Sequence, residues 1–373
     1  MRESHSYFVF SFFSFSKGNF RKIAWFIIKK GLSIFFSVCV ATYATILIAE
    51  QGGYIDTVVI AQIKDDTRNL VMTDPLYSRL PPDQQQKLID AIVNNTIKAR
   101  GLDTPFYIRS FLYLKNALTL DLGRAIFLTS DSGSKRVSAI IAERLPYTIM
   151  LFTTATLLGS LITLSMGLYL SRHRGSLIDR LIVTLAPLST IPGWFYGIIF
   201  IMIFAMYLGI LPYGGLVSVP PPEDPLMYAL DVLRHSILPL FAWLFAGFWL
   251  GSYSNRNFFL MFSTHDYVRV GDAKGLGEKT VLWRYIVRPS LPNIVTSLSL
   301  GIIGSWTGAT VTETVFNWPG LGSLTYQAIG VKDTPIIVGT TVIYAYLLGI
   351  TVLFLDLVYA ALDPRIKKQV VGT

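Results

Sequence analysis

Uncharged stretches recur along the chain at lengths that match a membrane-spanning helix. The windows without Asp, Glu, Lys or Arg are residues 31–49, 146–171, 181–222, 236–255, 289–312 and 335–355. Each is about 19 residues or longer, the length needed to cross roughly 30 Å of hydrocarbon as a helix. A helix buried in a soluble protein is rarely apolar on every side over such a length. The pattern predicts an all-α integral membrane protein.

The third window decides the number of spans, because residues 181–208 are long for one helix and short for two. With one kinked span there, the chain has six transmembrane helices, and its cytoplasmic segments hold about 18 of the 32 Lys and Arg residues. Two spans would place the basic loop 256–288 outside the cell, against the preference of short basic loops for the cytoplasm. We therefore expect six spans with both termini cytoplasmic.

These boundaries divide the chain into five parts. We expect a cytoplasmic extension, a first transmembrane helix, a large extracytoplasmic cap, a five-helix core and a cytoplasmic tail, at residues 1–30, 31–49, 50–145, 146–360 and 361–373. The first apolar window is too long for a typical signal peptide, and residues 50–51 are a poor cleavage context. We therefore interpret it as a retained span.

The predicted cap has a helical pattern. Pro82 and Asp83 open a run that Gly101 ends. Its apolar residues fall on one stripe, namely Leu88, Ile89, Ile92, Val93 and Ile97. The cap contains no His and no Cys, which removes the usual metal ligands and the commonest general base. We expect a helical cap rather than an enzyme domain.

Composition agrees with a membrane protein. Only 15% of the residues are charged and 52% are hydrophobic, whereas soluble domains carry about 25% charged residues. The single cysteine excludes an internal disulfide and a cysteine-cluster metal site. The net charge of +9 is spread over separate segments, so we expect membrane lipid and no nucleic acid as a partner.

The basic loop at 256–289, here the coupling loop, has the most distinctive pattern. Ser263 or Thr264 is placed to cap a helix at 265–274, which Gly275 would end in the left-handed conformation. From composition alone, the loop is either a compact protrusion or a patch lying on anionic headgroups.

A second short helix is expected at 279–287, before Pro289 turns the chain into the next span. The segment GLGEKT at 275–280 ends like a phosphate-binding loop, but Glu278 stands where that motif needs Gly. The chain therefore shows no nucleotide site of its own.

Residues 265–276, HDYVRVGDAKGL, resemble the EAA loop of ABC-importer permeases of the dipeptide and oligopeptide class, which reads DYVRxAxAKGL. Other segments resemble further motifs of that family in the same order: GLDTPFYIR and DLG at 101–123, ERLPYT at 143–148, ETVFNWPGLG at 313–322 and DLVYAALDPR at 356–365. Residues 271–272 depart from the pattern, since the family more often has Ala-Arg where this chain has Gly-Asp.

The resemblance implies the permease subunit of an ATP-driven, binding-protein-dependent importer in a prokaryotic cell membrane. Such a chain pairs with a second permease subunit, two ABC ATPase subunits and an extracytoplasmic solute-binding protein. ATP and Mg would bind the ATPases, so no cofactor, metal or catalytic residue is expected here. The ATPase-coupling residues implied are Asp266, Tyr267, Arg269, Gly271, Ala273, Lys274, Gly275 and Leu276.

Six other residues are candidates for the translocation pathway or its gate, each with a structural alternative: Pro192, Trp194, Glu313, Phe316, Trp318 and Asp356. Pro192 is placed to kink the third span, and the structural alternative for the Trp residues is a role as interface anchors or in packing. Glu313 is placed to cap the turn at 316–322, and Asp356 to cap a helix or pair with a nearby base.

Relatives of the family imply peptides as the substrate, with oligosaccharide or nickel as alternatives. The alternative of another class is a secondary transporter driven by an ion gradient. It would show an inverted repeat and carboxylates near the membrane midplane, and the sequence shows neither. A membrane sensor would have fewer spans and a recognisable signalling domain.

Overall fold

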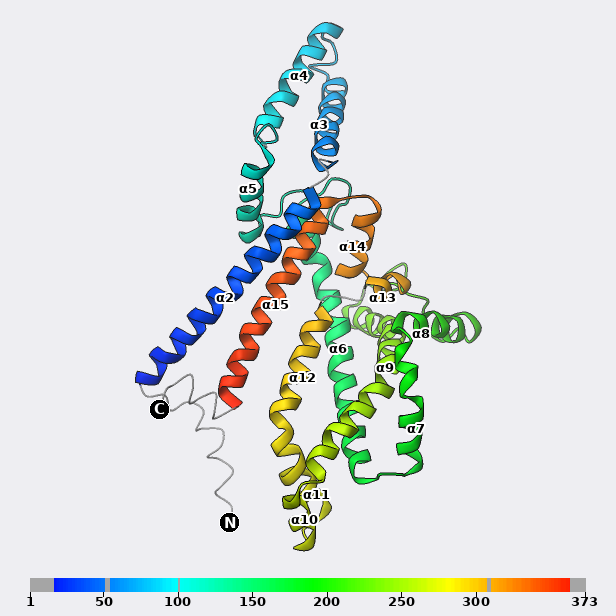
Figure 1. The fold of residues 1–373 in the computed structure, drawn as a ribbon. Helices are drawn as coiled ribbons and strands as arrows, with labels where there is room; N and C mark the ends of the chain where they lie inside the picture. Colours follow the sequence, from blue (N-terminus) through cyan, green and yellow to red (C-terminus); the bar gives the residue numbers. More distant parts are fainter. Residues whose placement is uncertain (1–16, 51–53, 100, 307–309, 363–373) are drawn as a thin grey trace. The chain divides into compact units, whose positions relative to one another are not determined.

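The computed structural model describes residues 17–50, 54–99, 101–306 and 310–362 (Figure 1). Over these residues the fold is helical, and its only β-type pairing is an isolated bridge between Arg124 and Arg136. The predicted all-α class is therefore confirmed for the described part of the chain. The chain divides into two compact units, and we describe each by itself.

The smaller unit comprises Ile34–Glu143 and Gln327–Tyr346. It contains parts of three long helices, α2, α6 and α15, and all of three shorter ones, α3, α4 and α5. Their bounds are α2 Lys17–Glu50, α3 Tyr54–Thr73, α4 Pro82–Ala99, α5 Phe106–Leu118, α6 Val137–Arg172 and α15 Thr334–Leu362.

Helices α3 and α4 lie side by side and bury the apolar stripe predicted for the cap (Figure 1). Ile89 and Val93 of α4 are buried against Ile63 and Val71 of α3. The rest of the stripe packs around this cluster: Leu88, Ile92 and Ile97. Gly101 follows with a φ of +67°, where a residue with a side chain would be strained. The predicted end of this helix is confirmed.

One carboxylate holds the loop between α5 and α6. Asp333 is fully buried and accepts hydrogen bonds from the backbone N–H groups of Ile126, Phe127 and Leu128, at 2.8 to 3.1 Å. Nearby, the hydroxyl of Tyr346 donates to the carbonyl of Leu118 at 2.8 Å. Buried backbone donors must be paired, so these contacts fix the loop against the start of α15.

The larger unit is centred on Arg144–Tyr326. After α6 it contains α7 Leu177–Leu185, η1 Ala186–Thr190, α8 Gly193–Phe200, η2 Ile201–Tyr207, α9 Pro225–Ser263, α10 Asp266–Ala273, α11 Glu278–Val281, η3 Leu282–Val287, α12 Arg288–Trp306, α13 Thr310–Val315 and the start of α14 Leu321–Gly330. Helix α6 begins at Val137 and runs through Pro146, so the helix starts about two turns before the uncharged window at 146–171.

Glycines let α6 approach its neighbours closely. A Cβ on Gly167 would lie 2.5 Å from the Cβ of Asn255 on α9, and one on Gly251 would lie 3.0 Å from Thr163. A Cβ on Gly301 of α12 would lie 3.2 Å from the methyl group of Thr156. Small residues at such crossings are typical of helices that pack within a membrane.

Among the described residues, four helical segments are long and apolar enough to cross a membrane: Ile28–Ile48, Val137–Arg172, Pro225–Ser263 and Thr334–Phe354. A fifth candidate is the pair Leu177–Thr190 and Gly193–Tyr207, bent by 96° as a broken span or a re-entrant loop. The break falls at Ile191 and Pro192, where a kink was predicted. Helix α12 covers residues 289–306 of the fifth uncharged window and is not among the candidates found in the described residues.

The described helices therefore give four or five candidate spans, and the six-span topology stays a prediction. Residues 1–16 of the expected N-terminal extension and residues 363–373 of the expected tail lie outside the described residues.

Replacing Asp333 tests its role in the smaller unit. We expect Asp333→Ala to lower the free energy of unfolding in detergent by about 3 kcal/mol, because three backbone donors lose a charged acceptor. Limited trypsin digestion should then cleave faster in the loop at Arg124 and Lys135. The matched control is Asp121→Asn in the same loop, whose side chain is exposed. Equal effects of the two substitutions would contradict this role.

Candidate functional site

Helix α10 of the coupling loop ends as predicted but begins differently. It runs from Asp266 to Ala273, and Gly275 follows with a φ of +69°. The predicted cap is wrong: the N-cap residue is His265, without a side-chain cap hydrogen bond. The hydroxyls of Ser263 and Thr264 bond back to the carbonyl of Leu260 instead, at 3.2 and 3.0 Å. Ser263 is the last residue of α9 and Thr264 is its C-cap, and hydroxyls at a helix end commonly take this partner.

The second short helix exists, but Pro289 does not turn the chain. Helix α11 continues through the wide turns of η3 into α12 without a break. A proline inside a helix collides with the carbonyl four residues earlier and leaves it unbonded. The π-helical turns at Leu282–Val287 precede Pro289 directly and give that carbonyl room, so the helix continues.

The apolar faces of both short helices are buried within the chain. Val268 of α10, Val281 of α11 and Ile286 of η3 are fully buried, and they cluster with Phe259 near the end of α9. Partly buried residues of α6 complete this cluster: Leu164 and Leu168. The coupling loop is therefore a compact protrusion, seated on the ends of α6 and α9 (Figure 1).

The residues implied in ATPase coupling divide by exposure. Gly271 is buried, and Leu276 packs in the apolar cluster. The others lie on the exposed side: Asp266, Tyr267, Arg269, Ala273, Lys274 and Gly275. A Cβ on Gly271 would meet Leu276 and Val281 at 3.8 Å, an ordinary contact, so the alanine more frequent in the family would fit here.

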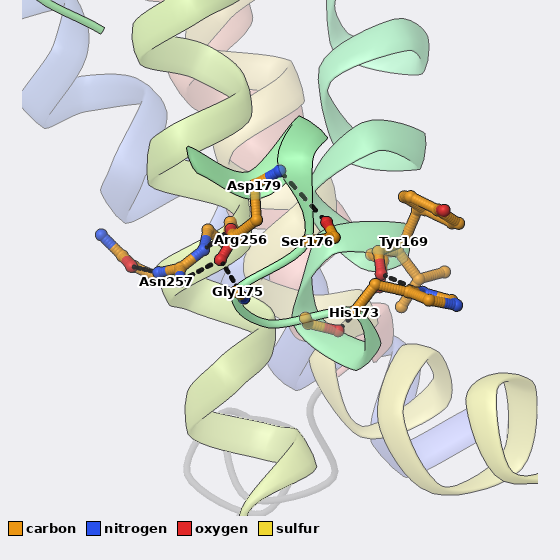
Figure 2. A network of polar contacts seen from close by, with 9 residues as sticks. Tyr169, His173, Gly175, Ser176, Asp179, Arg256 and Asn257 are labelled. Atoms are coloured by element: carbon orange, nitrogen blue, oxygen red, sulfur yellow. Dashed lines mark hydrogen bonds and ion pairs between the residues drawn. The ribbon is translucent and has the colours of Figure 1, made fainter. Parts of the chain in front are cut away.

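Ion pairs that the sequence did not indicate surround the base of this protrusion. Arg256 of α9 makes a two-pronged pair with Asp179 of α7, which also accepts from the backbone N–H of Gly175 at 2.8 Å (Figure 2). Arg172, the last residue of α6, pairs with Asp272 of α10 at 3.2 Å. The partners lie 77 and 100 residues apart, so no local spacing could have linked them.

Three pathway candidates belong to one structural module, which consists of Glu313, Phe316, Trp318 and their contacts. Glu313 is fully buried and accepts hydrogen bonds from the hydroxyl of Thr148, at 2.8 Å, and from the backbone N–H of Ser323, at 2.9 Å. Ser323 lies in the first turn of α14, so the carboxylate caps this helix. The backbone N–H of Leu321 donates to the hydroxyl of Thr148 at 2.7 Å.

The two aromatic residues of this module are buried in different places. Phe316 packs with Ala205, Leu238 and Ala242, between η2 and α9. Trp318 packs with Leu151 and Phe152 of α6, and its indole N–H donates to the carbonyl of Tyr147 at 3.1 Å. The module therefore joins residues 147–152 of α6 to α9.

The other pathway candidates are less informative. Pro192 is exposed at the break between η1 and α8, and Trp194 is half-buried with its ring edge-on to Phe195. Asp356 falls within α15, and its side chain is outside the described part of the structure.

A cavity of about 640 Å³ lies among α6, α9 and α12. Aromatic rings line one part of it: Phe241, Trp243, Phe245, Phe248 and Trp249. Glycines and hydroxyl residues line much of the rest: Thr156, Gly159, Ser160, Thr163, Gly247, Gly251, Gly301, Gly304 and Ser305. The described lining contains no charged side chain and none of the described pathway candidates.

Residues 155–368 match the family model described as binding-protein-dependent transport system inner membrane component. The chain belongs to this family. The matched region includes all of α9 to α12, and with them the coupling loop and most of the cavity lining.

Similar proteins are permease subunits of peptide transport systems. The oligopeptide transport system permease protein AppB of Bacillus subtilis is 31% identical, over 79% of this chain and 90% of that protein. The dipeptide transport system permease protein DppB of Lactococcus lactis is 28% identical, over 78% of this chain and 87% of that protein. The dipeptide transport system permease protein DppB of Bacillus subtilis is also 28% identical, over 77% of this chain and 88% of that protein.

The Glu313 module predicts that two glycines, one before α14 and one at its end, differ in how well they tolerate a side chain. A Cβ on Gly320 would collide with the carboxylate of Glu313, whereas one on Gly330 would meet nothing within 4 Å. We expect Gly320→Ala to lower the free energy of unfolding in detergent by about 2 kcal/mol, the usual cost of overpacking. Gly330→Ala should leave it unchanged or slightly raised. A similar loss of unfolding free energy in both variants would argue against the capping of α14 by Glu313.

Proposed function

We propose that this chain is the permease subunit of an ATP-driven, binding-protein-dependent peptide importer in a bacterial inner membrane. The observation that carries the proposal is the coupling loop, whose apolar side is buried on α6 and α9 while most of its family motif is exposed. A loop built in this way presents a preformed surface to a partner and joins that surface to the transmembrane helices.

The proposed partners are a second permease subunit, two ABC ATPase subunits and an extracytoplasmic solute-binding protein. The coupling loop would dock on an ATPase subunit and would therefore lie on the cytoplasmic side. This orientation agrees with the proposed six spans and the cytoplasmic termini. ATP would be bound and hydrolysed on the partner subunits.

The cavity among α6, α9 and α12 is the proposed passage for the peptide. Its volume exceeds the lower range of small-molecule sites, about 300 Å³. Rings and hydroxyls without a fixed charge suit a backbone that carries many different side chains, because no single side chain is required for a strong contact. Passage here also places the substrate beside the helices that carry the coupling loop.

The docking of the coupling loop is tested by Gly275→Trp. A Cβ here meets nothing within 4 Å, and the positive φ strains any residue with a side chain, so the substitution alters the exposed end of α10 without disturbing the buried cluster. We expect the complex purified through the tagged permease to lose its ATPase subunits, measured by quantitative mass spectrometry.

The matched control is Gly133→Trp, in the loop between α5 and α6. Gly133 also has a positive φ, of +79°, and open space around its Cβ. This variant should keep the ATPase subunits. A Gly275→Trp complex that keeps them too would place the docking surface elsewhere on the chain. An unmodified chain that purifies without ATPase subunits would contradict the importer and favour an ion-gradient-driven transporter.

The passage is tested by Gly247→Trp. Gly247 lines the cavity, and a Cβ added there would meet no atom within 4 Å, so an indole fills space without a local clash. We expect peptide uptake by proteoliposomes containing the assembled transporter to fall at least about tenfold, while all subunits still co-purify. Gly31→Trp on α2, also with open space, is the control.

Loss of the second permease from the Gly247→Trp complex would instead make the cavity a subunit interface. Uptake of oligosaccharide or nickel in place of peptide by the unmodified transporter would replace the proposed substrate.

A further inference from the structure

The side chain of Asp272 is engaged within its own chain. Its two carboxylate oxygens accept from the guanidinium of Arg172 at 3.2 and 3.4 Å. Asp272 lies in the last turn of α10, and Arg172 is the C-terminal residue of α6. The acid that departs from the family pattern therefore joins the coupling loop to a transmembrane helix.

The end of α6 is joined in turn to α7 and α9. Residues 173–176 form a short turn, which the contacts of Asp179 fix in place (Figure 2). The backbone N–H of Asp179 donates to the hydroxyl of Ser176 at 3.2 Å, and its carboxylate accepts from the N–H of Gly175 at 2.8 Å. The same carboxylate holds both prongs of Arg256, and the side chains of this pair are only 5% and 14% exposed.

Ion pairs and apolar packing transmit movement differently. The cluster around Val268 is held by apolar packing, which is non-directional. A guanidinium and a carboxylate that share several hydrogen bonds fix both distance and direction. A displacement of α10 that pulls on Asp272 therefore acts on the end of α6 and on the turn that leads into α7.

We propose that Arg172 and Asp272 are positioning residues that carry the movement of the coupling loop to the α6–α7 turn, from which the Asp179–Arg256 pair passes it to α9. This inference rests on the proposed function. It assigns Asp272 to a contact within the permease, although Asp272 lies on the surface helix that is proposed to meet the ATPase.

The pair is suited to a test because it is partly exposed, at 23% for Arg172 and 43% for Asp272. Exposed ion pairs contribute little to folding free energy, so their loss should leave the protein folded. The test variants are Asp272→Arg, Arg172→Asp and the two together, each in the complete transporter reconstituted in proteoliposomes. The quantity measured is peptide transported per ATP hydrolysed.

We expect each single variant to lower this ratio at least about fivefold while the ATPase subunits still co-purify. The double variant restores an opposite-charge pair and should return the ratio to within about twofold of the unmodified transporter. Arg180→Asp is the control, because Arg180 is exposed on α7, close to the same turn, and should leave the ratio unchanged. A purely structural role would change yield or stability rather than this ratio.

Two results would overturn the inference. An unchanged ratio in both single variants would reduce the pair to a surface contact. Loss of ATPase subunits from the Asp272→Arg complex, without rescue in the double variant, would assign Asp272 to the ATPase interface. Neither result affects the proposed function, which is tested separately by whether the unmodified chain co-purifies with ATPase subunits.

Discussion

The close crossing of α6 and α9 is the constraint on which the larger unit depends. At Gly167 the two backbones come so near that a Cβ would lie 2.6 Å from the carbonyl carbon of Asn255. The amide of Asn255 donates to the hydroxyl of Thr163 at 3.1 Å, which fixes the rotation of one helix against the other. Arg256, the next residue, is thereby directed to Asp179. The crossing thus places the ends of both helices, on which the coupling loop is seated.

Buried carboxylates perform one common task in this chain. Asp333 binds the backbone of a loop, Glu313 binds the first turn of α14, and Asp179 binds the turn before α7. In each case the backbone has left a regular helix and exposes N–H groups that need a partner. In an apolar environment an unpaired N–H is expensive, so an acid is retained where a helix begins or a loop is buried. The role of these three acids in the described structure is to accept hydrogen bonds from backbone N–H groups.

The sequence predicted what depends on local periodicity. The stripe of α4, the end of α10 at Gly275 and the break at Pro192 all follow from neighbouring residues, and the structure has them. The contacts of Glu313 with Thr148, and of Asp272 with Arg172, join residues 165 and 100 positions apart. No spacing rule connects residues so far apart, and a sequence motif does not indicate which distant residue its side chains will contact. The cavity was missed for the same reason, since three helices far apart in the sequence line it. Pro289 was misread because the π-helical turns that accommodate it have no sequence signature.

The right-angled break at Pro192 has a mechanical consequence. Helices α7 and α8 belong to two arms that meet at 96°. Because the two helical segments are almost perpendicular, a movement of one along its own axis displaces the other sideways rather than lengthwise. A small lengthwise shift of α7 would therefore displace α8 laterally over its whole length. Gly197 of α8 lies directly against the ring of Phe316, so that displacement would reach the module that contains Glu313.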